Sequence, residues 1–179
     1  MVEAVVAVAI TSIAGGALLA SLGGAVRSSS DAMHAAVARG LAEQLMEEIA
    51  ATRFPAGTNT TPIGVGRTGF DDIDDFDVWS SSPPVDRSGN TLGLDGLDAA
   101  AQPATRPAAL QPAAGFIAAF AREVDVERVE PDTGSSWNIV TGHTNFRRVT
   151  VRVKHTDAQS HIRTLAELTR VFSYVPVSP

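Results

Sequence analysis

The sequence contains no cysteine, few aromatic residues and no excess of positive charge. Without cysteine, the chain can form neither a disulfide framework nor a thiolate metal site. Its 14 basic residues against 20 acidic residues give a formal net charge of −6. That balance argues against a general nucleic-acid-binding protein, which carries a basic footprint. At 179 residues, the chain is long enough for one domain and an appendage.

The sequence also lacks the common motifs of catalysis. It has no cysteine nucleophile and no GxSxG elbow. The GxGxxG pattern at residues 64–69 follows a Pro- and Thr-rich segment, so it lacks the strand and helix of a dinucleotide site. None of the histidines stands at a metal-binding spacing such as HExxH: His34, His143, His155 and His161. We therefore predict that the protein is not an enzyme.

A long apolar run opens the chain. From Ala4 to Val26 the only polar residues are Thr11, Ser12 and Ser21. A helix of this length spans roughly 34 Å, enough to cross the ~30 Å hydrocarbon core of a bilayer. A cleaved secretory signal would begin with basic residues and have a shorter apolar core. An ordinary membrane anchor is the second alternative.

The helical pattern continues beyond this run, because no proline occurs before Pro55. Apolar residues recur every four positions: Met33, Val37, Leu41, Leu45 and Ile49. This spacing predicts an amphipathic helix that ends near Phe54-Pro55 and Gly57. We expect one helix of about 53 residues. Residues 1–27 would form a protruding hydrophobic segment for assembly or membrane insertion, and residues 28–54 would form the amphipathic half packed on a head at 55–179.

Small residues recur at regular positions in the apolar segment. Gly16, Ala20 and Gly24 stand four positions apart on one face, a spacing that lets helices approach closely. Glycine also weakens a helix by about 1 kcal/mol relative to alanine. The pairs Gly15-Gly16 and Gly23-Gly24 are therefore the predicted places for the helix to stretch or break.

The start of the chain, MVEAVVAVAI, followed by a continuous helix, resembles the N-terminus of type IV pilins and of the pseudopilins of type II secretion. Met1-Val2-Glu3 matches the Leu-(Ile/Val)-Glu part of the family motif. The basic leader, its glycine and the Phe-Thr pair are missing. By that match the mature chain starts two residues before Met1, or the protein is an atypical member. The rest of the chain matches only loosely, to the β-rich heads of pilin-like subunits.

The resemblance implies a role for Glu3, the acid at the start of the apolar segment. In the family this glutamate pairs with the N-terminal amine of a neighbouring subunit during assembly. Physical chemistry agrees, because a buried carboxylate is tolerated mainly when it is paired, and an ionisable residue at membrane depth suggests a function. The alternative is that Glu3 lies in water near the positive end of the helix dipole.

An acidic cluster follows the helix, with five aspartates within seven positions: Asp71, Asp72, Asp74, Asp75 and Asp77. Carboxylates at this density suit Ca²⁺, although the spacing does not fit an EF-hand loop. A solvated acidic loop anchored by neighbouring aromatic residues is the favoured alternative. Residues 71–100 carry a local charge of −7 and residues 140–179 a local charge of +4. These are either two solvated faces, or an acidic loop that meets a basic strand surface.

The remainder predicts an antiparallel sheet of about four strands, giving an α+β head. Residues 80–115 are rich in Ser, Pro, Ala and Gly, and predict a surface excursion. Phe116 to Ala121 fits a strand or a helical turn. Residues 146–156 alternate most clearly, with valines on one face and basic residues on the other. Ile162 to Val175 fits a returning strand better than a helix.

The sequence therefore predicts a structural subunit that polymerises through a bundle of N-terminal helices into a type IV pilus-like extracellular filament. Its expected partners are identical subunits, the cytoplasmic membrane before assembly, and the assembly machinery. Two alternatives stay open: a minor pseudopilin of a periplasmic pseudopilus, and a membrane-anchored module whose head binds a ligand. No cofactor is expected, with calcium as the open question.

Overall fold

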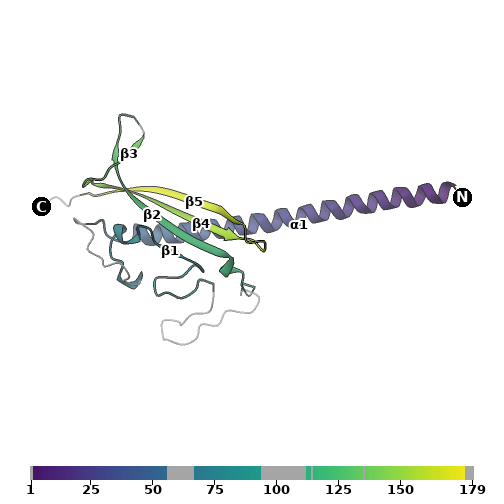
Figure 1. Ribbon diagram of the computed structural model, residues 1–179, viewed down its shortest axis with the longest axis horizontal. Helices are drawn as coiled ribbons and strands as arrows, with labels where there is room; N and C mark the ends of the chain where they lie inside the picture. The colour runs from purple at the N-terminus through teal and green to yellow at the C-terminus, as the bar shows by residue number, and fades with distance from the viewer. Residues whose placement is uncertain (1, 56–66, 94–111, 114, 135, 176–179) are drawn as a thin grey trace. The chain divides into compact units, whose positions relative to one another are not determined.

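The computed structural model describes residues 2–55, 67–93, 112–113, 115–134 and 136–175. These residues form one long helix and an antiparallel sheet, which confirms the α+β prediction. The chain divides into two compact units, residues 1–37 and residues 38–179. The division falls inside the helix, so its last turns belong with the sheet (Figure 1).

The helix α1 runs without interruption over Val2–Ala50, 49 residues. It ends slightly before the predicted boundary near Phe54, because the next residues take other hydrogen-bond partners. The Thr52 hydroxyl donates to the carbonyl of Ile49 at 2.7 Å. Arg53 forms a parallel bridge with Asp72, and its carbonyl accepts from the amide of Ile73 at 3.2 Å. A contact with a distant segment therefore sets the end of the helix.

The last three turns of α1 carry the apolar stripe that faces the core. Its buried residues recur at three- and four-residue intervals, as one helix face requires: Ala38, Leu41, Ala42, Leu45, Met46 and Ile49. The stripe begins later than the sequence predicted. Met33 is 50 % exposed and Val37 is half-buried. The part of α1 that packs in the head is therefore shorter than the predicted amphipathic half.

The sheet has five antiparallel strands in the order β1-β2-β4-β5, with β3 paired to β2 away from this path. The strands are β1 Ser80–Ser81, β2 Phe120–Pro131, β3 Trp137–Ile139, β4 Phe146–Thr156 and β5 Ile162–Ser173. Figure 1 shows β2, β4 and β5 as the long strands of the sheet. The predicted strand at residues 146–156 and its returning partner are confirmed, and the helical alternative for that partner is wrong.

Alternation explains which face of the sheet is buried. Val149, Val151 and Val153 of β4 are fully buried, as is Val124 of β2 beside them. The opposite face carries ion pairs between β2 and β4, such as Lys154 with Glu123 at 2.7 Å. Successive side chains of a strand point to opposite faces. The apolar positions therefore mark the buried face of the sheet, and the charged positions mark the opposite face.

Short 3-10 helices complete the head at Arg67–Gly69, Ile73–Phe76 and Ile117–Ala119. Ile117–Ala119 is the predicted helical turn, and β2 begins directly after it. The rings of Phe70 and Phe76 pack edge to face with centroids 5.0 Å apart. The predicted excursion differs at its start, because Ser80–Ser81 pair with β2 and Val85 bridges to Thr91. Its residues 94–111 lie outside the described chain.

Candidate assembly interface

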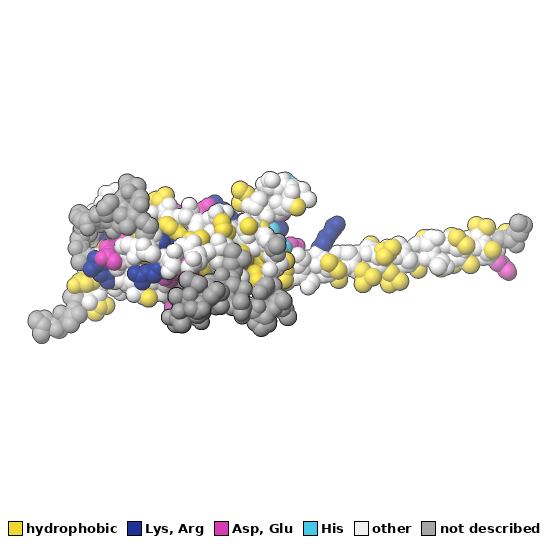
Figure 2. Space-filling model, turned by 90° about the horizontal axis from the view of Figure 1, so that it is seen from below, with side chains coloured by type: hydrophobic (Ala, Val, Ile, Leu, Met, Phe, Trp, Pro, Cys, Tyr) yellow, Lys and Arg dark blue, Asp and Glu magenta, His cyan; other side chains and the backbone are white. Residues whose placement is uncertain are grey.

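The first part of α1 exposes a continuous apolar surface. Its large aliphatic side chains are between 49 % and 77 % exposed: Val2, Val5, Val6, Val8, Ile10, Ile13, Leu18, Leu19, Leu22 and Val26. Figure 2 shows apolar side chains along this segment with very few charged ones. Patches of this extent in soluble proteins mark interfaces with other proteins or with membranes. By length and composition alone, α1 is apolar enough to cross a membrane, as is a signal sequence near an N-terminus.

The polar side chains inside this segment do not disturb its apolar character. Thr11 donates its hydroxyl to the carbonyl of Ala7, and Ser12 donates to that of Val8, both at 2.8 Å. These bonds to the preceding turn satisfy each hydroxyl within the helix. Two residues of the segment therefore need no water or external partner, which suits them to lipid or to a helix bundle.

The predicted small-residue positions also lie in this segment. At Gly15, Gly16, Gly23 and Gly24, an added Cβ would meet nothing within 4 Å. The fold of a single chain therefore does not require glycine at any of them. The helix passes through both glycine pairs without a break, and its stretching during assembly stays a prediction. Ala20 lies on the same exposed surface, between Gly16 and Gly24.

Glu3 lies in the first turn of α1 and is exposed. Arg27, the other charged residue between positions 2 and 30, is exposed as well. Neither makes an ion pair with any residue that the structure describes. The apolar segment thus presents one carboxylate and one guanidinium that are both accessible to a second molecule.

In the head, the structure separates the five predicted calcium ligands. Carboxylate oxygens of Asp71, Asp72 and Asp75 lie within 4.8 Å of one another. Asp74 turns away and pairs with Arg147, while Asp77 accepts the amide of Val126 at 3.1 Å. A 3-10 helix has three residues per turn, which brings Asp72 and Asp75 to one side and Asp74 to another.

The three clustered carboxylates already have roles in the fold. Asp72 and Asp75 form a reciprocal capping box at the start of Ile73–Phe76. Asp71 pairs with Arg53, where the chain leaves α1. Burial, followed by the charge of Asp75, raises the pKa of Asp72. The capping role explains the cluster without a cation, and calcium binding stays an untested prediction.

Asp74 is the centre of a buried ion pair. Arg147 Nε donates to its Oδ1 at 2.6 Å and Nη2 to its Oδ2 at 3.1 Å. Arg147 is 1 % exposed, and its Nη1 also donates to the carbonyl of Thr144 at 2.9 Å. At this point the acidic segment meets the basic strand β4, as one of the two interpretations of the charge pattern required.

A second group of buried arginines was missed from the sequence. Arg67 pairs with Glu48 of α1, and its guanidinium lies 4.5 Å from the centroid of Trp79. Arg122 is fully buried, and both arginines donate to the carbonyl of Val85. Burial, then repulsion by Arg67, lowers the pKa of Arg122 to about 10. Alternation carried a signal, because Arg122 shares a face with the buried Phe120 and Val124.

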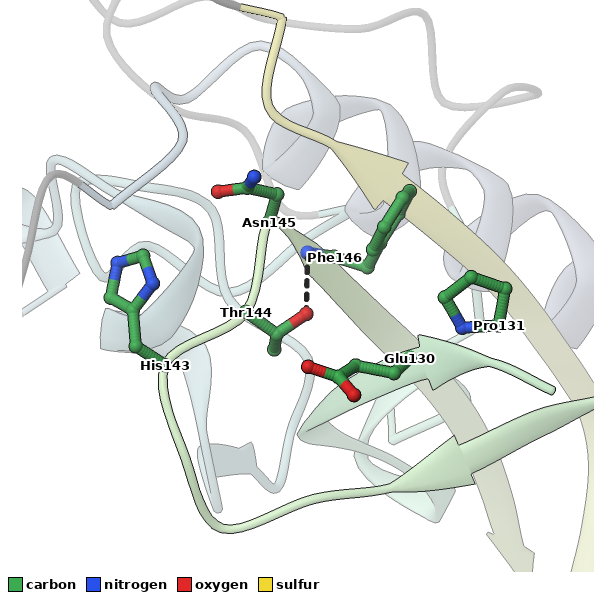
Figure 3. Close-up of a pocket in the computed structure, with 6 residues that line it drawn as sticks. All are labelled: Glu130, Pro131, His143, Thr144, Asn145 and Phe146. Atoms are coloured by element: carbon green, nitrogen blue, oxygen red, sulfur yellow. Dashed lines mark hydrogen bonds between the residues drawn. The ribbon is translucent and has the colours of Figure 1, made fainter.

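A shallow hollow of about 330 Å³ lies between the end of β2 and the start of β4. It is lined by Glu130, Pro131, His143, Thr144, Asn145 and Phe146 (Figure 3). The Thr144 hydroxyl donates to the carbonyl of Val129 at 2.7 Å and accepts from the amide of Phe146 at 3.2 Å. Because that hydroxyl is engaged in both directions, it does not have the arrangement of an activated nucleophile.

Comparisons of the chain with protein-family models, with curated proteins and with solved structures found no match. The exposed helix, its two charges and the contacts of the head therefore provide the basis for a functional assignment.

Proposed function

We propose that this chain is a structural subunit of a type IV pilus-like filament, which polymerises through a bundle of its N-terminal helices. The observation that supports it best is the uninterrupted helix Val2–Ala50, which buries a stripe only from Ala38 onward and exposes apolar side chains before it. The subunit is held in the cytoplasmic membrane before assembly and is extracellular afterwards. Its role is assembly, without catalysis.

The physical reason is that the exposed segment needs an apolar environment that its own chain does not supply. Lipid and a bundle of identical helices both provide one. Transfer from lipid to a bundle gains little from the hydrophobic effect, because lipid tails are already apolar. Close packing and the matching of polar groups must drive it instead. Small residues at Gly16, Ala20 and Gly24 permit that packing, and Glu3 supplies a charge to be matched.

A filament also requires an interface that does not close on itself. Contacts between two different faces of the same subunit repeat without limit, whereas a two-fold contact ends at a dimer. In a filament, parallel helices are displaced from one another along the filament axis, so no two-fold axis relates them and they meet through different faces. The proposed bundle is therefore heterologous. A minor subunit of a periplasmic pseudopilus would use the same contacts at low copy number.

A membrane-anchored binding module is the competing function. Two observations favour it: α1 is apolar enough to span a bilayer, and the head has a polar hollow between β2 and β4. An anchor of this kind requires length and apolarity only. It would tolerate the loss of the Glu3 carboxylate, whereas a helix bundle that excludes water would not.

The test is electron microscopy of filaments sheared from cells, with the fibre protein identified by mass spectrometry. Cells carrying wild-type chain, Glu3→Ala and the control Glu43→Ala are compared. Glu43 is an exposed acid of the same helix and pairs with Arg39. We expect the chain to form fibres in the wild type and in the Glu43 control, and Glu3→Ala to lack them. A chain that stays in the membrane while fibres persist without it would refute the filament and favour the anchored module.

A further inference from the structure

The two charges of the apolar segment are placed at its two ends. Glu3 and Arg27 are 24 positions apart, with no other charged residue between them. Along an α-helix this separation is about 36 Å. Both side chains are exposed, and neither has an ion-pair partner among the residues that the structure describes. Among the described residues, the apolar segment thus has one anion and one cation without an ion-pair partner.

This spacing suits a bilayer. A separation of about 36 Å slightly exceeds the ~30 Å hydrocarbon core, so each charge reaches the polar layer on its own side. In a helix bundle, lipid headgroups and water are no longer available along the segment. An isolated charge in such an environment is strongly unfavourable unless it is paired. The bundle must therefore match each carboxylate with a cation.

We propose that Glu3 of one copy pairs with Arg27 of a second, parallel copy that is displaced along the helix axis by about 36 Å. This inference rests on the proposed filament and names the contact that sets its stagger. Every chain supplies one Glu3 and one Arg27, so each interior chain makes one pair with a copy on either side. The charges balance at any filament length.

The angle between the two residues determines the kind of contact. At 3.6 residues per turn, Glu3 and Arg27 point about 120° apart around the helix axis. An antiparallel dimer would pair both residues with one neighbour, which requires them on the same face. Directions about 120° apart instead engage two different neighbours. That contact is heterologous, and the axial displacement of about 36 Å keeps it from closing into a ring.

The first experiment is a double-mutant cycle on the full-length chain, with filament yield measured by microscopy and by the amount of chain in the sheared fraction. We expect Glu3→Gln and Arg27→Gln each to lower the yield about tenfold or more, because each leaves one buried charge unmatched. The double variant removes both charges and should recover part of the yield. The charge reversal Glu3→Arg with Arg27→Glu should recover it as well.

Arg39→Gln is the matched control, because Arg39 is an exposed arginine of the same helix that pairs with Glu43. Near-ultraviolet circular dichroism of each variant tests whether the head remains folded. If the filament yield of the double variant is no higher than that of the poorer single variant, the proposed pairing is overturned. Glu3 would then find its cation elsewhere, such as a neighbour's amino group, or Arg27 would pair with Asp31 of its own helix.

The second experiment measures the stagger directly by cross-linking, which the absence of native cysteine makes unambiguous. Ala7 and Ser30 lie one turn beyond Glu3 and Arg27, and helical geometry turns them to the same side of the proposed contact. Ala7→Cys combined with Ser30→Cys should form disulfide-linked chains in filaments. An antiparallel pair would instead link Ala7→Cys with Gly24→Cys. Ala7→Cys alone is the control for in-register contact.

The outcomes separate this inference from the proposed function. Ladders of linked chains from the Ala7/Ser30 variant support the stagger. Filaments that contain the chain but link only through Ala7/Gly24, or through Ala7 alone, overturn the stagger and leave the filament intact. Filaments that form no link in any combination also overturn it, since disulfides need Cα atoms within about 7 Å. A chain that forms no filament refutes both.

Discussion

Removal of the Asp74 carboxylate tests how the head is held together. The Arg147 guanidinium is 1 % exposed and the Asp74 side chain 9 % exposed, and two hydrogen bonds of 2.6 and 3.1 Å join them. Among the described residues, Asp74→Ala leaves this buried cation with the carbonyl acceptors of Thr144 and Phe146 and with Phe54, whose ring centroid lies 5.1 Å away. Loss of one partner from such a pair costs about 3–5 kcal/mol.

The melting temperature of the full-length chain in non-ionic detergent, followed by near-ultraviolet circular dichroism, measures this cost. For a head of this size we expect Asp74→Ala to lower it by roughly 10–20 °C. Asp71→Ala is the matched control, because Asp71 belongs to the same acidic segment and also pairs with an arginine. That pair is 67 % and 56 % exposed, so its loss should cost at most about 1 kcal/mol.

A further variant separates the charge from the packing. Asp74→Leu combined with Arg147→Met removes both charges and should recover most of the melting temperature, since apolar replacements of buried ion pairs are often neutral. Equal effects of Asp74→Ala and Asp71→Ala would refute the reasoning. Such a result would mean that the Arg147 charge is compensated without Asp74.

Three further predictions concern other parts of the chain. Arg122→Met should leave the melting temperature unchanged or raise it. Within the described part of the chain Arg122 donates to no carboxylate, and the Val85 carbonyl keeps a second donor at 2.6 Å. A fall as large as that of Asp74→Ala would contradict this. Hydrogen bonding from the His161 amide lowers the pKa of Asp157, so its contribution is present above the ordinary pKa and is lost as pH falls below about 4. Melting curves of wild type and Asp157→Asn should therefore differ near neutral pH and converge in acid, and a constant difference would argue against the assignment. Gly16→Leu should leave the head's melting temperature unchanged but reduce filament yield, whereas Ala17→Leu, one position later, should reduce the yield less. Equal yields of the two variants would exclude close packing on the Gly16 face.

The main elements could be predicted from the sequence because local patterns determine them. The long helix follows from a proline-free stretch up to Pro55, and β4 follows from the alternation of Val149, Val151 and Val153 with polar residues. The end of α1 was harder to predict from the sequence, because the bridge between Arg53 and Asp72 determines it. The start of the buried stripe at Ala38 was missed, since Met33 fits the same periodicity and remains half exposed.

The contacts of the head could not be predicted, because they join residues far apart in sequence. Arg147 lies 73 positions from Asp74, and a basic residue in an alternating strand is ordinarily assigned to the solvent face. Alternation does place Arg147 on the buried face with Val149 and Val151, but it does not identify Asp74 as its partner. The acidic cluster was misleading for a related reason. Five aspartates within seven positions suggest one site, but the 3-10 turn divides them between capping, ion pairing and a strand amide.

The glycines of the apolar segment are not explained by packing in the head. The buried stripe of α1 begins at Ala38, and glycines 15, 16, 23 and 24 have open space where a Cβ would stand. Each glycine weakens a helix by about 1 kcal/mol relative to alanine, so the four together cost several kcal/mol and gain nothing within one chain. Lipid does not demand glycine either, because length and apolarity are enough for insertion. Close approach of another helix is the environment in which a missing side chain becomes an advantage. The glycines and the two unmatched charges therefore point independently to a second copy of this chain, and variants in this segment should alter assembly without altering the stability of the head.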